Sequence, residues 1–157
     1  MIGSVARFGN EGSLSEWREL INRVNEELEQ LDAELSGVKP LFGKLANRDP
    51  DEIEMRAAAL SVHAFYNGIE NVFTLIAKHY DQQVPSGLRW HRQLLDRMSE
   101  RIDRRPAIIE KSEYDILAEY LSFRHLVRHS YPGSLSWYRF SEVARNLYSA
   151  HQCRVAQ

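Results

Sequence analysis

Apolar residues recur along this chain with helical spacing, and no segment alternates over a useful length with the period of a strand. Over residues 14–35 they follow one another at intervals of three and four residues. This pattern is typical of a helix that lies nearly parallel to its neighbour. The seam consists of Leu14, Trp17, Ile21, Val24, Leu28, Leu31 and Leu35. Ser13 and Glu16 have capping-box spacing at its start, and Gly37 and Pro40 predict its end.

Two further helices are predicted in the middle of the chain. Asp49 as N-cap and Pro50 in the first turn predict a helix that runs to about Tyr80. Its buried face would consist of Val62, Phe65, Tyr66, Ile69, Phe73 and Ile76. Pro85-Ser86-Gly87 precedes a third helix, which Arg104-Arg105-Pro106 ends. The apolar residues of that helix are Trp90, Leu94, Leu95 and Met98.

The last part of the chain predicts two more helices. Ser112-x-x-Asp115 has the pattern of a cap, and Pro132-Gly133 ends the fourth helix. The apolar stripe of this helix is Leu117, Tyr120, Leu121 and Val127. A fifth helix begins near Ser134, with Trp137, Phe140, Val143, Ala144 and Leu147 on its apolar face. The whole pattern predicts an all-α protein, an up-and-down bundle of about five helices.

Length and composition narrow the class of protein. The chain has 157 residues, of which 43% are hydrophobic, so we expect a single domain over residues 1–157 that folds without disulfides or a metal. Cys153 is the only cysteine, which excludes a disulfide framework and a four-ligand zinc ribbon. The first seven residues lack the features of an export signal, and no apolar run is long enough to span a bilayer. We therefore expect a cytoplasmic protein without a membrane partner.

The net charge of −2 conceals an asymmetry between the two halves of the chain. Residues 1–80 carry 8 basic and 13 acidic side chains, and residues 81–157 carry 12 and 9. Six arginines lie between Arg89 and Arg105, including Arg92. Arginine makes bidentate contacts to phosphate, so this stretch could bind nucleic acid. The alternative is a solvated helix face with ion pairs between successive turns.

The strongest candidate for chemistry is the end of the fourth predicted helix. At 100° per residue, Arg124 falls in the middle of the apolar stripe, where a cation needs a partner or a ligand. Arg128 and Tyr131 fall on the same side, and His125 and His129 lie on a flank one turn apart. Two arginines, two histidines and a tyrosine therefore occupy the last two turns before a Pro-Gly break.

Three interpretations of this cluster compete. The first is structural, because cations are stabilised near a helix C-terminus and Arg124 could form an ion pair inside the bundle. The second is a metal site, since His125 and His129 have i,i+4 spacing, although no third ligand lies at a telling offset. The third is phosphodiester chemistry without a metal, in which an arginine holds the phosphate and a histidine moves a proton. RNA suits this chemistry because its 2′-OH is a built-in nucleophile.

Residues outside this cluster have simpler interpretations, with one exception. Glu70 lies at the edge of the apolar stripe of the second predicted helix. There it could pair with Arg124 or Arg128, or orient a catalytic group. Three other histidines are expected to be surface or hydrogen-bonded residues and not ligands: His63, His79 and His151. The tryptophans are expected to be core or interface anchors: Trp17, Trp90 and Trp137.

The cluster also resembles a known family. Arg124-x4-His129-x-Tyr131 matches the Arg-x4-His-x-Tyr signature of HEPN ribonuclease toxins, in particular the HepT-like group that is paired with MNT nucleotidyltransferase antitoxins. Three segments resemble the second, third and fourth helices of that group, in the same order. They are Ala64–Glu70, Trp90–Leu95 and Phe123–Tyr131, and the resemblance covers roughly residues 50–150.

The resemblance implies a fold, an activity and a set of partners. It implies a HEPN-like helical domain that forms a homodimer and acts as a metal-independent endoribonuclease on cellular RNA, with no cofactor. Arg124 and His129 would be catalytic, with Arg128, His125, Glu70 and Arg92 supporting catalysis or binding RNA. Tyr131 would be the site at which the cognate MNT-type antitoxin adds adenylyl groups. Pro132-Gly133-Ser134 departs from relatives, which more often carry Gly and an acidic residue here.

A second hypothesis keeps the fold and changes the activity. The chain could be a HEPN protein without nuclease activity that acts as a helical interaction subunit or binds a nucleotide. A neighbouring reading frame for a small nucleotidyltransferase would favour the toxin hypothesis.

Overall fold

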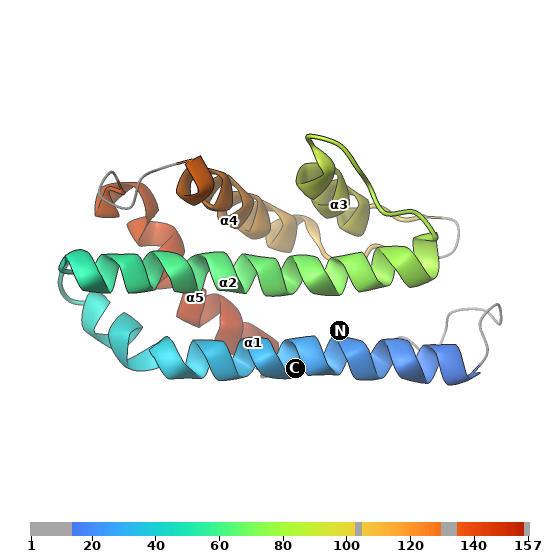
Figure 1. The fold of residues 1–157 in the computed structure, drawn as a ribbon, viewed down its shortest axis with the longest axis horizontal. Helices are drawn as coiled ribbons and strands as arrows, with labels where there is room; N and C mark the ends of the chain where they lie inside the picture. Colours follow the sequence, from blue (N-terminus) through green and yellow to red (C-terminus); the bar gives the residue numbers. More distant parts are fainter. Residues whose placement is uncertain (1–13, 103–104, 130–134, 156–157) are drawn as a thin grey trace. The chain divides into compact units, whose positions relative to one another are not determined.

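The computed structural model describes residues 14–102, 105–129 and 135–155 (Figure 1). Its helices are α1 (Leu14–Leu45), α2 (Glu52–Ile76), the π-helical segment η2 (Ala77–Asp81), α3 (Trp90–Ser99), α4 (Lys111–His129) and α5 (Trp137–Val155). Within these ranges there is no strand, and the only β-type pairing is an isolated bridge between Ile102 and Arg105. The prediction of an all-α bundle with five helices is confirmed. No helix in the described ranges has both the length and the apolar character needed to cross a bilayer.

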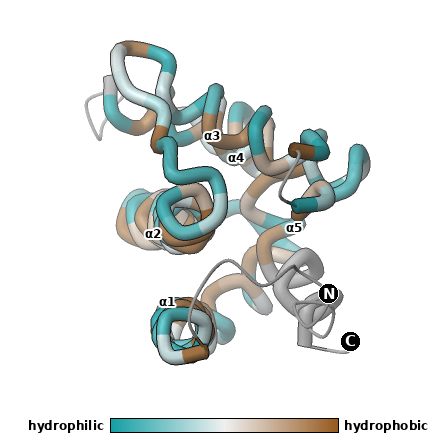
Figure 2. Tube along the Cα trace, turned by 90° about the vertical axis from the view of Figure 1, so that its right-hand side faces the viewer, coloured by the Kyte–Doolittle hydropathy of each residue, from teal (hydrophilic) through white to brown (hydrophobic). Residues whose placement is uncertain are grey.

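The chain divides into two compact units. Unit 1 takes its residues from Met1–Glu29 and Gly68–Ala118, and unit 2 from Gln30–Asn67 and Glu119–Gln157. The helices α1, α2 and α4 each contribute residues to both units. Figure 2 shows hydrophilic and hydrophobic residues on each of α1 and α2, as expected for amphipathic helices.

Unit 1 has a small apolar core between α1 and α2. Leu20 and Val24 of α1 pack with Val72 and Leu75 of α2, and four partly buried side chains surround them: Trp17, Leu28, Ile76 and Tyr80. The ring centroids of Trp17 and Tyr80 are 4.5 Å apart. Leu94, Leu95 and Met98 of α3 are fully buried, as predicted. Leu14, by contrast, is exposed and Leu20 is buried, so the predicted seam has the wrong register at its start.

Unit 2 has an aromatic core that fixes α4 against α2 and α5. Phe65 of α2 contacts Tyr120 of α4 with ring centroids 5.0 Å apart, and Phe123 of α4 contacts Phe140 of α5 at 4.7 Å. Burial raises the pKa of the Tyr120 phenol. Its hydroxyl donates a hydrogen bond to the Val143 carbonyl at 3.1 Å, as a buried phenol requires. These contacts hold the C-terminal half of α4 against the parts of α2 and α5 that belong to the same unit.

The first helix is longer than predicted. Gly37 and Pro40 do not end α1, which continues to Leu45. Proline removes one backbone hydrogen bond and crowds the preceding turn, at a cost of about 3 kcal/mol in a helix interior. Phe42 and Leu45 lie beyond this position and are both buried, so their packing offsets the cost.

Two predicted helix starts are shifted. Asp51, not Asp49, caps α2, because its Oδ1 accepts a hydrogen bond from the Glu54 amide at 2.8 Å, and Glu54 Oε2 accepts from the Asp51 amide at 3.1 Å. The Arg48 guanidinium, together with this amide, lowers the pKa of Glu54 to about 2. At the start of α4 the Glu110 amide donates to Glu113, so the helix begins before the predicted cap Ser112.

The third helix ends earlier than predicted, at Ser99. The predicted stop at Arg104-Arg105-Pro106 is wrong, since these residues lie beyond the end of the helix. Arg105 instead folds back onto the last turn of α3 and onto Asp81. Its guanidinium is buried and donates to both carboxylate oxygens of Asp81, at 2.8 and 3.0 Å, and to the Arg97 carbonyl at 3.0 Å. Asp81 ends the π-helical segment, and its side chain is completely buried. This ion pair connects the end of η2 to the loop after α3 within unit 1.

We predict that replacing the two expected helix breakers stabilises the protein. In Gly37→Ala the free energy of unfolding should rise by about 0.5–1 kcal/mol, because nothing lies within 4 Å of the added methyl group. Pro40→Ala should raise it by up to about 3 kcal/mol, since it restores a helical hydrogen bond. Urea unfolding measures both values.

Gly87→Ala is the matched control for this prediction. Gly87 has φ of +92°, so an added Cβ should destabilise the protein even though the site is open. A loss of stability in Gly37→Ala or Pro40→Ala would contradict a continuous α1.

Candidate functional site

The last turns of α4, in unit 2, carry Arg124, His125 and Arg128 of the predicted cluster. Arg124 is partly buried, and His125 and Arg128 are exposed. The buried residues of α4 in this unit are Tyr120 and Phe123. Phe123 was not in the predicted stripe, but it is buried together with Tyr120, while Arg124 is only partly buried. The guanidinium can therefore reach a polar partner and a ligand.

Asn67 of α2 is the polar partner of Arg124. The guanidinium Nε donates to the amide Oδ1 of Asn67 at 3.3 Å. The amide Nδ2 of Asn67 lies 3.0 Å from Nε2 of His63, one turn earlier on the same helix. All three side chains belong to unit 2. From the sequence, Asn67 was noted only within the segment Ala64–Glu70 that resembles the family, and His63 was not expected to have a role at the site. Their i,i+4 spacing nevertheless places them on one face of α2.

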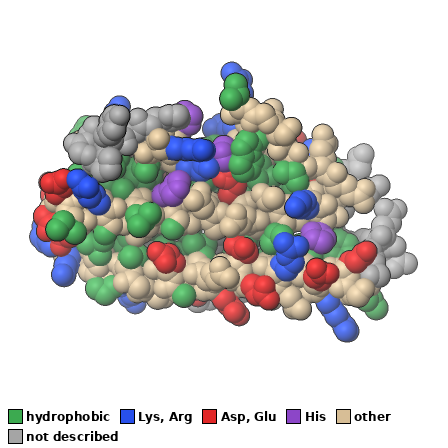
Figure 3. Space-filling view, viewed as in Figure 1, with side chains coloured by type: hydrophobic (Ala, Val, Ile, Leu, Met, Phe, Trp, Pro, Cys, Tyr) green, Lys and Arg blue, Asp and Glu red, His purple; other side chains and the backbone are tan. Residues whose placement is uncertain are grey.

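The charges at the end of α4 suit an anionic ligand. His125, Arg128 and the last residue, His129, follow Arg124 on a helix whose C-terminal end stabilises cations. On the face seen in Figure 3, basic and histidine side chains gather over the end of α4. For His129 the structure describes the helix position but not the side chain, and Tyr131 and Pro132-Gly133 lie outside the described residues.

Glu70 belongs to unit 1 and contacts a histidine there. Its carboxylate Oε1 is hydrogen-bonded to Nδ1 of His91, at the start of α3, and both side chains are largely buried. The ring of Trp90 packs on His91, with centroids 3.6 Å apart. The sequence did not suggest His91 as a partner, and the pairing of Glu70 with Arg124 or Arg128 stays a prediction.

The arginine-rich stretch is neither one binding surface nor one solvated face. Arg92 forms an i,i+4 pair with Asp96 at 3.3 Å, and its guanidinium lies 5.3 Å from the centroid of the Tyr114 ring. Arg92 remains about half exposed, so it can still contact RNA. For Arg105 both interpretations are wrong, because its side chain is 1% exposed and bound to Asp81.

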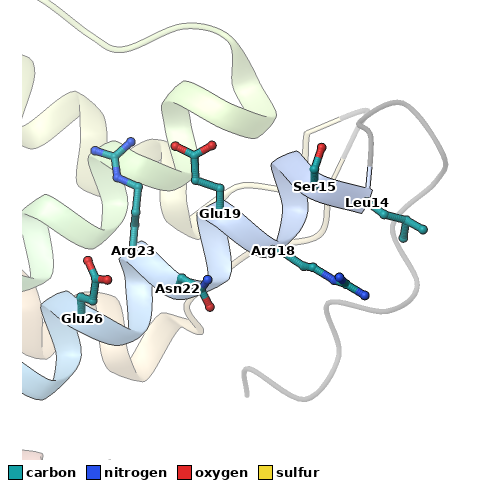
Figure 4. A pocket seen from close by; sticks show the side chains of 7 residues that line it. All are labelled: Leu14, Ser15, Arg18, Glu19, Asn22, Arg23 and Glu26. Carbon is teal, nitrogen blue, oxygen red and sulfur yellow. The ribbon is translucent and has the colours of Figure 1, made fainter.

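Neither a metal site nor the hollow on α1 is a strong candidate for the functional site. Among the described residues, no group of three or more His, Cys, Asp or Glu side chains is arranged to hold a metal ion. A shallow hollow lies on the first turns of α1 (Figure 4). Its side chains do not converge, since Glu19 and Arg23 extend to one side of the helix and Leu14 and Arg18 to another.

Comparison with known proteins identifies a family. The model of a family described as HepT-like protein matches residues 57–154. This range includes Asn67, all of α4 and the Arg-x4-His-x-Tyr segment. Neither the curated proteins nor the solved structures give a match.

Proposed function

This chain belongs to the HepT-like family of HEPN toxins, and from that premise we propose that it is a metal-independent endoribonuclease toxin. Arg124 and His129 would be its catalytic residues. The observation that carries the proposal is the position of Arg124. A partly buried cation on α4 that contacts Asn67 and is followed by three further basic or histidine residues suits a phosphodiester.

Arg124 would stabilise the charge that develops during cleavage. A guanidinium presents paired N–H donors to phosphoryl oxygens, and these bonds are about twice as strong as neutral ones. Because Asn67 fixes the side chain at Nε, the guanidinium is held before RNA arrives. Donors that need no reorganisation during the reaction contribute most to stabilising the transition state.

His129 would transfer the proton. As general base it takes the proton of the 2′-OH while the 2′-oxygen bonds to phosphorus and the bond from phosphorus to the 5′-oxygen breaks. As general acid it instead protonates the departing 5′-oxygen, and in either role solvent water supplies or takes the other proton. Either role leaves a 2′,3′-cyclic phosphate and a 5′-OH, and no water is consumed in this step.

We predict that His129→Ala abolishes RNA cleavage and toxicity while the protein remains folded. Loss of a proton-transfer group typically lowers a rate by about 10²–10⁴-fold. Arg124→Lys should also lose most of its rate, because an ammonium cannot make the bidentate contact. Cleavage of a fluorescent RNA measures both variants, with circular dichroism as a check on folding. Normal cleavage by His129→Ala would refute its assignment.

The same geometry predicts a homodimer. Arg124 and His129 are five residues apart, which places them about 140° apart around α4. One protomer therefore has difficulty directing both at one phosphate, whereas a two-fold axis near the end of α4 would place two copies in one cleft. Light scattering at micromolar concentration should give the mass of a dimer, about twice 18.3 kDa. A monomer would contradict this mechanism.

The partner that controls the toxin would be an MNT-type nucleotidyltransferase acting on Tyr131. This residue is two positions beyond the last residue of α4. Each added AMP would bring a phosphate near Arg124 and Arg128, where charge-assisted hydrogen bonds could hold it. The modification would then occupy the site of the RNA phosphate and repel RNA without any refolding.

We predict that co-expression with the cognate nucleotidyltransferase adds AMP, about 329 Da for each group, to Tyr131. Mass spectrometry of the purified toxin and of its peptides locates the adduct. Tyr131→Phe should carry no adduct and should escape neutralisation. If Tyr131→Phe is still neutralised, or the adduct lies elsewhere, control works by another route, such as occlusion in a complex.

A further inference from the structure

We propose that Asn67 and His63 of α2 form a hydrogen-bonded relay that positions the guanidinium of Arg124. The inference deepens the proposed function and rests on it for its catalytic consequence. The two contacts that carry it are Arg124 Nε to Asn67 Oδ1 at 3.3 Å and Asn67 Nδ2 to His63 Nε2 at 3.0 Å. Neither residue touches the reacting atoms in this scheme, so both act through Arg124.

The direction of the relay follows from which atoms can donate. An arginine side chain has only donors, so the atom of Asn67 that faces Arg124 must be the amide oxygen. The amide nitrogen of Asn67 then faces His63, and it too can only donate. Nε2 of His63 must therefore accept, which makes its imidazole the neutral tautomer with the proton on Nδ1.

His63 in this way supports the orientation of Asn67 that presents the amide oxygen to Arg124. If the Asn67 amide turned by 180°, its nitrogen would face the Arg124 Nε–H and its oxygen would face an imidazole acceptor. The contact with Arg124 would be lost because donor would meet donor, and the imidazole would keep its contact only by moving its proton from Nδ1 to Nε2. A partly buried polar group left without its hydrogen bond costs about 1–3 kcal/mol. This cost is what holds the acceptor toward Arg124.

The frame behind the relay is rigid. His63 and Asn67 are one turn apart on α2, and Val62, Phe65 and Tyr66 between and beside them are almost fully buried. The contact of Phe65 with Tyr120 fixes α4 one turn before Arg124. Catalytic side chains need support of this kind from packed neighbours and hydrogen bonds. A misplacement of the Arg124 guanidinium by about 1 Å could lower the rate by about 10²-fold.

The relay is tested with variants that keep or remove one hydrogen bond at a time. Asn67→Leu removes both bonds at similar volume and should lower kcat by about 10–100-fold with little change in KM, as expected when transition-state contacts are lost. His63→Leu should lower kcat by about tenfold, the cost of a hydrogen bond. His63→Gln should restore most of this loss, because its amide oxygen can accept from Asn67. Ser61→Ala is the control, since it removes a buried hydrogen bond to Ala57 on the same helix and should leave kcat unchanged.

A second measurement does not depend on activity. The side-chain Nε–H signal of Arg124 in a nitrogen-15 NMR spectrum is identified by its absence in Arg124→Lys. Its exchange with water should accelerate in Asn67→Leu and in His63→Leu and should slow again in His63→Gln. The relay is overturned if this signal and kcat are the same in His63→Leu as in the wild type, or if His63→Gln is no better than His63→Leu. If the signal behaves as expected but the wild type cleaves no RNA, the relay stands and the nuclease proposal fails.

Discussion

A partly buried cation on a helix must find a polar partner, and this requirement organises the site. The rings of Tyr120 and Phe123 attach α4 to α2 and α5, and Arg124 follows directly on the same helix. The available neighbour on α2 is the Asn67 amide, which accepts a bond from the guanidinium without neutralising its charge. An aspartate here would have formed an ion pair and reduced the attraction for a phosphate. A neutral acceptor orients the cation and does not itself neutralise the charge that a ligand would meet.

Buried carboxylate contacts in unit 1 show the opposite arrangement. Arg105 is buried and bound through two of its nitrogens to the carboxylate of Asp81. Removal of one partner from such a pair leaves an uncompensated charge, so these contacts fix the loop after α3 in unit 1. Glu70 and His91 form a second largely buried pair in that unit. Arg105 therefore stabilises the structure of unit 1, while the Nε of Arg124 in unit 2 donates to a neutral side chain.

Helical periodicity predicted the five helices and most of their buried faces, because it depends on local spacing. It failed where packing outweighs a local signal: α1 passes through Pro40 because Phe42 and Leu45 are buried beyond it. It also failed where a partner is distant in sequence. Nothing near Arg105 indicated Asp81, and nothing near Arg124 indicated Asn67, 57 residues earlier. The Arg-x4-His-x-Tyr signature identified the cluster on α4, but spacing along one helix carries no information about which residue of another helix supports it.

We propose that Arg124 and His129 catalyse attack by the 2′-OH of RNA on the adjacent phosphate. The most direct test is analysis of the cleaved ends in the presence of EDTA, with an RNA oligonucleotide and its counterpart carrying one 2′-deoxy residue at the cleavage site. With this mechanism the RNA gives a 2′,3′-cyclic phosphate and a 5′-OH, and EDTA does not lower the rate of cleavage. No cleavage is expected at the 2′-deoxy position. Products with a 5′-phosphate, or cleavage at the 2′-deoxy position, would contradict it.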